Sequence, residues 1–291
     1  MSQSKFKQAE KSIKAYFKKL DGKILFKKDI GNILWEESSN WDLTNLSVQK
    51  FIDQLKKLQL KEIALLSPTY EKSYIRYIWG KKVPLYSLCL SLKTKAYFSH
   101  HTAMYIHGLT GREPEIIYVN AEQSAKQRKD NALEQSRIDA AFQRKPRASQ
   151  YIFTYNDRKI CLLNGTHTNN LGVADQETSK GEIVPVTNIE RTLIDIAVRP
   201  FYSGGIKEVL NAYKMGKNKA SAKKLVSMLK KINYTYPYHQ AIGFYMERCD
   251  FDTSSLSLLK EIGIKYNFYL DYNMKRTEYS EEWKIYFPKG L

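Results

Sequence analysis

Three histidines in the middle of the chain are candidates for metal chemistry, because imidazole nitrogens are common zinc ligands. His100 and His101 are adjacent, and His107 follows on the same predicted helix. Adjacent helical residues point in different directions, so His100 and His101 cannot bind one ion together. The sequence also lacks an HExxH spacing and a cysteine partner for these residues. We therefore predict core or capping roles for the histidines and no metal site.

Motifs of covalent or phosphate chemistry are absent from the sequence. It contains no GxxxxGK[ST] loop, no GxGxxG turn, no GxSxG elbow and no Gly-Ser with an Asp-x-Asp pair. Glu113 and Glu115 come nearest to the acidic pair of a PD-(D/E)xK nuclease, but its lysine is missing. Asp195 is spaced for an i,i+4 ion pair with Arg191. We predict that the protein is not an enzyme, with no catalytic residue and no cofactor.

The charge of the chain indicates a polyanionic partner. The 291 residues include 47 Lys+Arg against 30 Asp+Glu, a formal net charge of +17. Residues 1–95 carry +10 of it and the longer remainder only +7. A basic module of this kind is typical of nucleic-acid binding. The alternative explanation of the positive charge is that the chain is rich in lysine because it comes from an AT-rich genome, and that these lysines simply cover the protein surface.

The sequence also predicts a cytoplasmic location. No run approaches the ~18 apolar residues of a membrane-spanning helix, so we expect no membrane partner. The first residues lack the apolar core of a secretory signal. Cys89, Cys161 and Cys249 are odd in number and far apart, which fits a reducing compartment.

The first third has the periodicity of a winged helix-turn-helix. Apolar residues recur at helical spacing over 5–20, 27–37 and 47–59. Residues 60–66 and 74–79 read as two strands joined by a turn. We predict the fold class α/β (α+β), with a winged helix-turn-helix at 1–84 and a larger mixed α/β domain at 85–291.

The third helix of this module is the expected recognition helix. Short polar side chains read base edges in the major groove, and lysines bind phosphates. The predicted DNA-binding residues are Lys27, Lys28, Thr44, Asn45, Ser47, Gln49, Lys50, Gln54, Lys57, Lys61, Lys72 and Arg76. Two alternatives stay open, since the helix also fits an ordinary soluble surface, and winged helices serve as protein–protein modules too.

The second part alternates predicted strands and helices. Strands are expected at 96–98, 115–120, 151–155, 159–163 and 183–186, with Pro185 indicating an edge position or a strand end for the last. Thr187 and Glu190 match a capping box that opens a helix ending at Val198. Residues 166–181 are predicted as a loop, and the basic segment 121–149 as a helix or a mobile arm. Further helices are expected at 205–215, from Ser221, and near 237–249 and 254–262, with late strands at 268–270 and 284–287.

Two segments of this second part resemble the AbiEi-type antitoxins of type IV toxin–antitoxin systems, a class of bacterial abortive-infection phage defences. The first, residues 96–110, reads AYFSHHTAMYIHGLT, and the second, residues 185–195, reads PVTNIERTLID. Residues 117–120 and 204–210 extend the similarity, which covers most of the chain because such proteins begin with a winged helix-turn-helix.

The resemblance implies an antitoxin that also represses its own operon. It would bind inverted repeats of double-stranded DNA in its own promoter and antagonise a nucleotidyltransferase-like toxin, usually without a stable complex. The C-terminal domain would be needed for antitoxicity and would assist repression. Two other functions stay open: a protein–protein inhibitor that neutralises the toxin by direct binding, and an enzyme that acts on nucleic acid.

Overall fold

The computed structural model describes residues 2–80, 82–125 and 132–291, and it is a mixed α/β protein, as predicted. The chain forms two compact units. The first comprises Met1–Thr94 with Tyr151–Ile160, and the second comprises Lys95–Gln150 with Cys161–Leu291. The first boundary between the compact units therefore falls at 94/95, whereas the predicted domain boundary is at 84/85. In addition, residues 151–160 return to the first unit.

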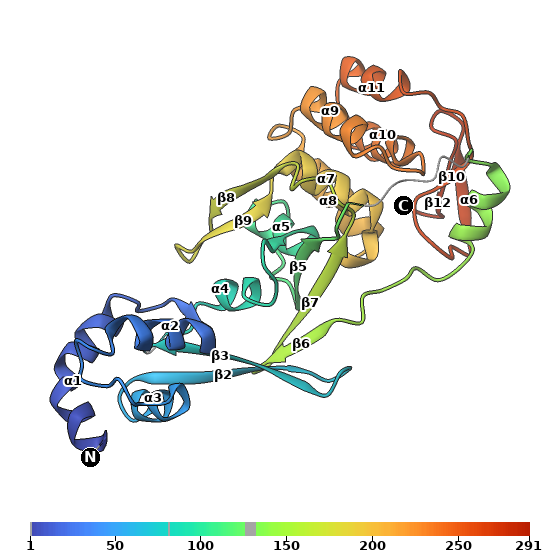
Figure 1. Cartoon of the computed structure of the whole chain (residues 1–291). Helices are drawn as coiled ribbons and strands as arrows, with labels where there is room; N and C mark the ends of the chain where they lie inside the picture. Colours follow the sequence, from blue (N-terminus) through green and yellow to red (C-terminus); the bar gives the residue numbers. More distant parts are fainter. Residues whose placement is uncertain (1, 81, 126–131) are drawn as a thin grey trace. The chain divides into compact units, whose positions relative to one another are not determined.

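Three helices open the first unit: α1 (Ser2–Lys18), α2 (Lys27–Glu37) and α3 (Val48–Lys56) (Figure 1). The bounds of α2 agree with the prediction, whereas α3 is shorter at both ends than predicted. The apolar stripes of the three helices meet in one core, where Ile13, Phe17, Phe51 and Ile52 are fully buried. Each such side chain stabilises the unit by about 1.5–3 kcal/mol relative to its exposed state.

The strands of the first unit hydrogen-bond in the order β1-β3-β2-β6. They are β1 (Ile24–Leu25), β2 (Leu60–Ser67), β3 (Lys72–Trp79) and β6 (Ile152–Tyr155). β2 and β3 form the predicted antiparallel hairpin, with Leu60 opposite Trp79 and Ser67 opposite Lys72. β6 pairs with β2 through Leu66 and Thr154, a contact between residues far apart in sequence. The short helix α4 (Leu85–Leu90) follows the hairpin.

The sheet of the second unit has the order β7-β5-β4-β9-β8. Its strands are β4 (Tyr97–Phe98), β5 (Ile116–Glu122), β7 (Arg158–Gly165), β8 (Val173–Glu177) and β9 (Ile183–Thr187). Neither expectation for Pro185 is right, because β9 pairs with β4 on one side and β8 on the other, and Pro185 is the middle residue of the strand. β8 forms within the segment predicted as a loop. As an outer strand with residues 174–177 exposed, it needs no apolar alternation, so its sequence carries no strand signal.

Helix α7 (Ile189–Val198) is the centre of the second unit, and all its residues after Ile189 are buried. Four other helices pack against it: α5 (His100–Ile106), α8 (Ile206–Gly216), α9 (Ala222–Ile232) and α10 (Tyr238–Arg248). A 3₁₀ turn (Pro200–Ser203) precedes α8, and α11 (Thr253–Lys260) follows α10. No helix among the described residues has the length and apolar composition needed to cross a bilayer.

The start of α7 corrects the predicted capping box. The N-cap is Asn188, whose Oδ1 accepts a hydrogen bond from the Arg191 backbone N–H at 2.9 Å. The Thr187 hydroxyl instead bonds to the Thr192 hydroxyl at 2.8 Å, and Glu190 accepts from the Ser221 backbone N–H at 3.0 Å. Asn is as good an N-cap as Thr, so adjacent candidates cannot be separated by residue type.

The C-terminal end forms a separate three-stranded sheet in the order β10-β12-β11. Its strands are β10 (Phe268–Tyr269), β11 (Thr277–Ser280) and β12 (Ile285–Pro288), of which β11 was not predicted. Trp283 precedes β12 and lies against Gly243 of α10, where a Cβ would come within 2.1 Å of the indole ring. Helix α6 (Gln135–Phe142) lies in the segment predicted as a helix or a mobile arm, and residues 126–131 of that segment lie outside the described residues.

Candidate nucleic-acid interface

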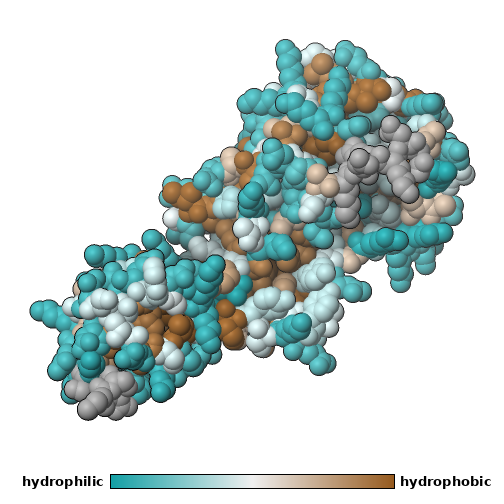
Figure 2. Space-filling model, in the orientation of Figure 1, coloured by the Kyte–Doolittle hydropathy of each residue, from teal (hydrophilic) through white to brown (hydrophobic). Residues whose placement is uncertain are grey.

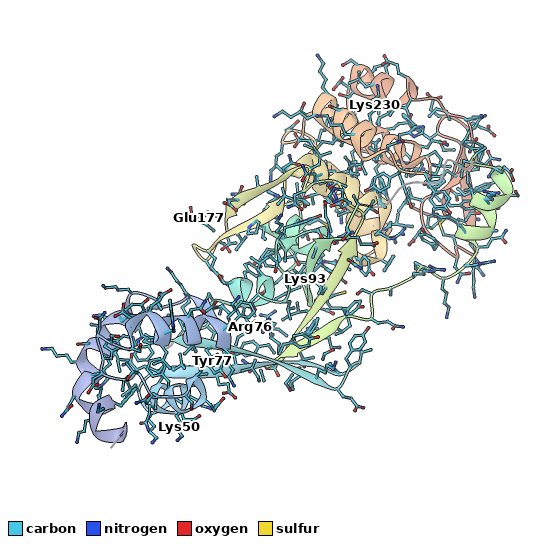
Figure 3. The ribbon with its side chains drawn as sticks, in the orientation of Figure 1. Lys50, Arg76, Tyr77, Lys93, Glu177 and Lys230 are labelled. Carbon is cyan, nitrogen blue, oxygen red and sulfur yellow. The ribbon has the colours of Figure 1, made fainter. Side chains whose placement is uncertain are left out.

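Helix α3 carries the centre of the predicted DNA-binding face. Its N-cap is Ser47, whose hydroxyl accepts a hydrogen bond from the Lys50 backbone N–H at 3.4 Å. At 3.6 residues per turn, Lys50 and Lys57 lie almost above one another, opposite the stripe that α3 buries in the core. Both lysines are exposed, and neither forms an ion pair with a described carboxylate (Figure 3 labels Lys50).

A chain of side-chain hydrogen bonds joins α2 to this face. Lys27 Nζ, in the first turn of α2, donates to Gln49 Oε1 at 2.8 Å. Gln49 Nε2 in turn donates to Asp53 Oδ1 at 3.1 Å. The two helices therefore hold Gln49 and Asp53 in a defined orientation on the exposed side of α3. Asp53 was not among the predicted residues, because one acidic side chain in a basic helix carries no separate signal.

The other predicted helical residues surround this centre. Lys28 is exposed beside Lys27 in the first turn of α2. Thr44 and Asn45 are exposed in the turn that leads into α3, and Gln54 is half-buried on its flank. The structure thus places all of them in α2, α3 and the turn between these helices.

The hairpin contributes two of its three predicted basic residues to the surface. Lys61 of β2 and Lys72 at the start of β3 are both exposed. Their side chains belong to opposite ends of the hairpin, since Lys61 lies opposite Ile78 and Lys72 opposite Ser67.

Arg76, labelled in Figure 3, is buried. The residue is only 6% exposed, so the structure does not place it at an exposed interface. Its guanidinium donates to Ser91 Oγ at 2.9 Å, to the Ser91 carbonyl at 2.7 Å and to the Ile75 carbonyl at 2.8 Å. It also lies 4.3 Å above the ring of Phe26, and burial lowers its pKa. The second half of β3 is buried at every position, so strand alternation gives no exposed site there.

Two exposed tyrosines that contact each other, Tyr70 at the hairpin tip and Tyr151 just before β6, escaped the sequence prediction. Tyr70, in the β2–β3 turn, stacks on Tyr151, with ring centroids 5.3 Å apart and planes 25° from parallel. Tyr74 and Phe153 make a second, edge-on contact at 5.1 Å. These contacts join the hairpin to a segment about 80 residues away in sequence, which no local pattern reveals.

Of the three candidate histidines, His107 and His100 have hydrogen-bond partners, whereas the buried His101 Nε2 has none among the described residues. His107 Nε2 lies 2.6 Å from the Thr187 carbonyl, which joins α5 to the start of α7. His100 Nδ1 lies 2.9 Å from Ser99 Oγ. Among the described residues, no group of three His, Cys, Asp or Glu side chains is placed to bind a metal ion.

Arg191 and Asp195 form a buried i,i+4 ion pair on α7, as the sequence indicated. Arg191 Nε lies 2.8 Å from Asp195 Oδ1, and the side chains are 5% and 7% exposed. Arg191 Nη1 also donates to the Leu171 carbonyl at 2.7 Å and to Thr168 Oγ1 at 3.1 Å. Burial alone would lower the pKa of Arg191, but Asp195 raises it above its usual value. The pair therefore fixes the chain before β8 to the central helix.

We expect the protein to lose stability below pH 6.5, because His100 is buried in its neutral form. Desolvation lowers the pKa of His100 to about 4, from an ordinary value near 6.5. Between these values the unfolded chain binds a proton that the folded chain does not, so the contribution is complete above pH 6.5 and is lost as the pH falls towards 4. At pH 5 the loss is about 2 kcal/mol.

Urea unfolding at pH 7 and pH 5 measures this loss. His100→Asn is the matched variant, because the backbone at His100 is left-handed (φ 51°) and Asn tolerates that conformation. The stability difference between the two pH values should be about 2 kcal/mol smaller in the variant. An equal difference in both proteins would contradict the assignment.

Comparisons with known proteins identify the fold alone. No family model matches the chain, and no curated protein matches it significantly. The chain is similar in structure to the RV2827C protein from Mycobacterium tuberculosis, known from a crystal structure. The match has a TM-score of 0.58 at 11% identity and covers 91% of this chain and 86% of that one. At this identity, the similarity establishes a shared mixed α/β architecture.

Proposed function

We propose that the first unit is a winged helix-turn-helix that binds double-stranded DNA, with α3 as the recognition helix. The observation that carries the proposal is the placement of Lys50 and of the C-cap residue Lys57 on the exposed side of α3, whose other side is anchored in the core. A recognition helix must combine a buried face with a polar and basic one. The hairpin of β2 and β3 is then the wing.

The side chains of this face divide into two kinds of contact. Phosphate contacts fall to the exposed lysines, which are Lys27, Lys28, Lys50, Lys57, Lys61 and Lys72. Lys27 and Lys28 lie at the N-terminus of α2, where the helix dipole already concentrates positive charge and favours an anion. Base contacts fall to Gln49, whose amide suits adenine, and to Asp53, whose carboxylate accepts from cytosine N4.

We further propose that the protein is an antitoxin and autorepressor of AbiEi type. The support for this step is the pair of segments at 96–110 and 185–195, together with the DNA-binding module ahead of them. The DNA bound is then the promoter of its own operon, called here the operator fragment. The partner antagonised is a nucleotidyltransferase-like toxin.

Binding to the operator fragment should fall steeply with salt. Neutralising six phosphates releases their counterions, so a plot of log K against log [salt] should have a slope of about −5. Affinity then drops about 10³-fold between 50 and 200 mM salt. Fluorescence anisotropy with the labelled operator fragment measures the slope, and a scrambled duplex of equal length is the control. The proposal fails if the operator fragment stays unbound at the lowest salt concentration.

A further inference from the structure

A cavity of about 190 Å³ lies in the second unit, between the C-terminal end of α9 and the start of α10. It belongs to a different unit from the proposed DNA-binding face. Aromatic and aliphatic side chains line most of it, with three polar ones among them. The lining residues are Leu229, Lys230, Asn233, Tyr234, Tyr236, Tyr238, His239 and Ile262.

Tyrosine rings give this cavity its shape. Tyr238 is 4% exposed, and its hydroxyl accepts a hydrogen bond from Arg199 Nη1 at 3.4 Å. The rings of Tyr234 and Tyr236 stand edge-on to it, at 5.2 Å and 77° and at 6.2 Å and 84°. Phe142 stands edge-on to Tyr236 at 5.5 Å, and the ring of Phe268 lies nearly parallel to it at 6.5 Å. The aromatic lining is therefore already in place, and a planar ring is the shape that such surfaces bind best.

The volume limits the occupant to one ring system. Pockets for drug-sized molecules measure about 300–1,000 Å³, above the 190 Å³ found here. The rest of any larger ligand must therefore lie outside. His239 Nε2 bonds to the Gly263 carbonyl at 2.7 Å, so its Nδ1 is an acceptor in the neutral ring. Burial lowers the pKa of His239, which keeps the ring neutral at pH 7.

Lysines gather beside the cavity on α9. Four of them, Lys223, Lys224, Lys230 and Lys231, are exposed and fall within an arc of about 120° on the helix. Helix α9 contains no acidic residue, and none of the four forms an ion pair with a described carboxylate. Lys230, which Figure 3 labels, belongs to this lysine stripe and also lines the cavity. Figure 2 shows the hydrophilic residues of this region, interrupted by small apolar patches.

We propose that the tyrosine cavity binds an unpaired nucleobase, while the lysine stripe binds the phosphates attached to it. Stacking on aromatic rings beside a basic track is how proteins hold unpaired nucleotides. An acidic peptide would engage the lysines but leave the aromatic cavity empty. A free mononucleotide and an unpaired nucleotide within a single strand share this chemistry. Because only a strand reaches all four lysines, it should bind more tightly than the mononucleotide.

Isothermal titration of the full-length protein tests the proposal with three probes: AMP, a short oligoadenylate RNA and inorganic polyphosphate. We expect saturable binding of AMP and tighter binding of the RNA. Equal affinities for AMP and RNA would show that the site binds a free nucleotide rather than a strand, and would still support a nucleotide-binding site in this cavity. The proposal is overturned if neither AMP nor RNA binds, or if polyphosphate binds as tightly as the RNA.

Two variants locate the binding. Tyr236→Ala should weaken RNA binding by about 5- to 150-fold, the range of one base stacked on one aromatic ring. Lys230→Glu should weaken it without disturbing the fold, since this side chain is exposed. Tyr236→Phe, which keeps the ring, and Lys180→Glu, an equal charge change in the β8–β9 turn, are the controls. Unchanged RNA binding by both Tyr236→Ala and Lys230→Glu would overturn the assignment. Both variants should still bind the operator fragment like the wild type, which distinguishes this cavity from the proposed DNA-binding face.

Discussion

The double variant Lys50→Glu/Lys57→Glu is expected to bind the operator fragment about 10²- to 10⁴-fold more weakly than the wild type. A charge-assisted hydrogen bond contributes about 1.5–3 kcal/mol, so the loss of two phosphate contacts costs about 3–6 kcal/mol. The substitutions also place two negative charges opposite the phosphates. The salt slope should fall by about 2 because two fewer phosphates are neutralised. Anisotropy over a range of salt concentrations measures affinity and slope together.

Lys11→Glu/Lys18→Glu is the matched control for this experiment. These lysines are also seven residues apart and exposed, but they lie on α1, away from α3 in the sequence. The control should keep nearly all operator binding, and thermal melting should show both double variants folded. If Lys50→Glu/Lys57→Glu binds the operator fragment like the wild type, α3 is not the recognition helix.

The same variant separates repression from antitoxicity. The AbiEi resemblance assigns neutralisation of the toxin to the C-terminal domain, which the two substitutions leave untouched. Cells that produce the proposed toxin should therefore grow with the variant as they do with the wild-type protein, while a promoter reporter is no longer repressed. Loss of both activities in a folded variant would show that antitoxicity depends on the DNA-binding unit.

Local patterns determined how well each element was predicted. Helix α2 combines an apolar stripe with clear ends, so its bounds follow from the sequence alone. The pairing of β6 with β2 joins residues 66 and 154, and no local pattern encodes a contact of that separation. β8 lacks alternation because it is an outer strand whose residues 174–177 are exposed. Long-range pairing and edge strands therefore account for the largest differences between the predicted and the observed fold.

The sequence predicted the exposure of residues of the candidate DNA-binding face where the helix period determines it. It failed where contacts with distant parts of the chain determine exposure. The positions of Lys50 and Lys57 follow from the period of α3. Arg76 was misjudged because Ser91, from another element, accepts its guanidinium hydrogen bonds and buries it. Tyr70 gains its partner, Tyr151, only through the return of residues 151–160 to the first unit.

The two segments that carry the AbiEi resemblance lie largely inside the second unit. His107 of the first contacts the carbonyl of Thr187 in the second, and Arg191 pairs with Asp195 in the interior. These contacts join the two segments to each other and stabilise the interior of the unit. A segment can mark a family because it builds the fold, and the activity then depends on the surfaces that this fold presents.

This interpretation predicts that Asp195→Ala destabilises the protein by about 3–5 kcal/mol. The substitution leaves the Arg191 guanidinium buried without its anion, and removal of one partner of a buried ion pair has that cost. Asp195→Asn keeps an acceptor for Arg191 Nε and should lose less. Urea unfolding followed by circular dichroism measures both variants.

An exposed ion pair in the same chain provides the matched control. Glu10 and Lys14 have the same i,i+4 spacing on α1, with side chains 33% and 46% exposed. Because water screens such a pair, Glu10→Ala should cost at most about 0.5 kcal/mol. If Asp195→Ala costs as little as Glu10→Ala and yet abolishes antitoxicity, Asp195 acts on a partner rather than on the fold. A large loss of stability would instead give the segment 185–195 a structural role, because its buried Arg191–Asp195 pair orders the chain before β8 through Arg191.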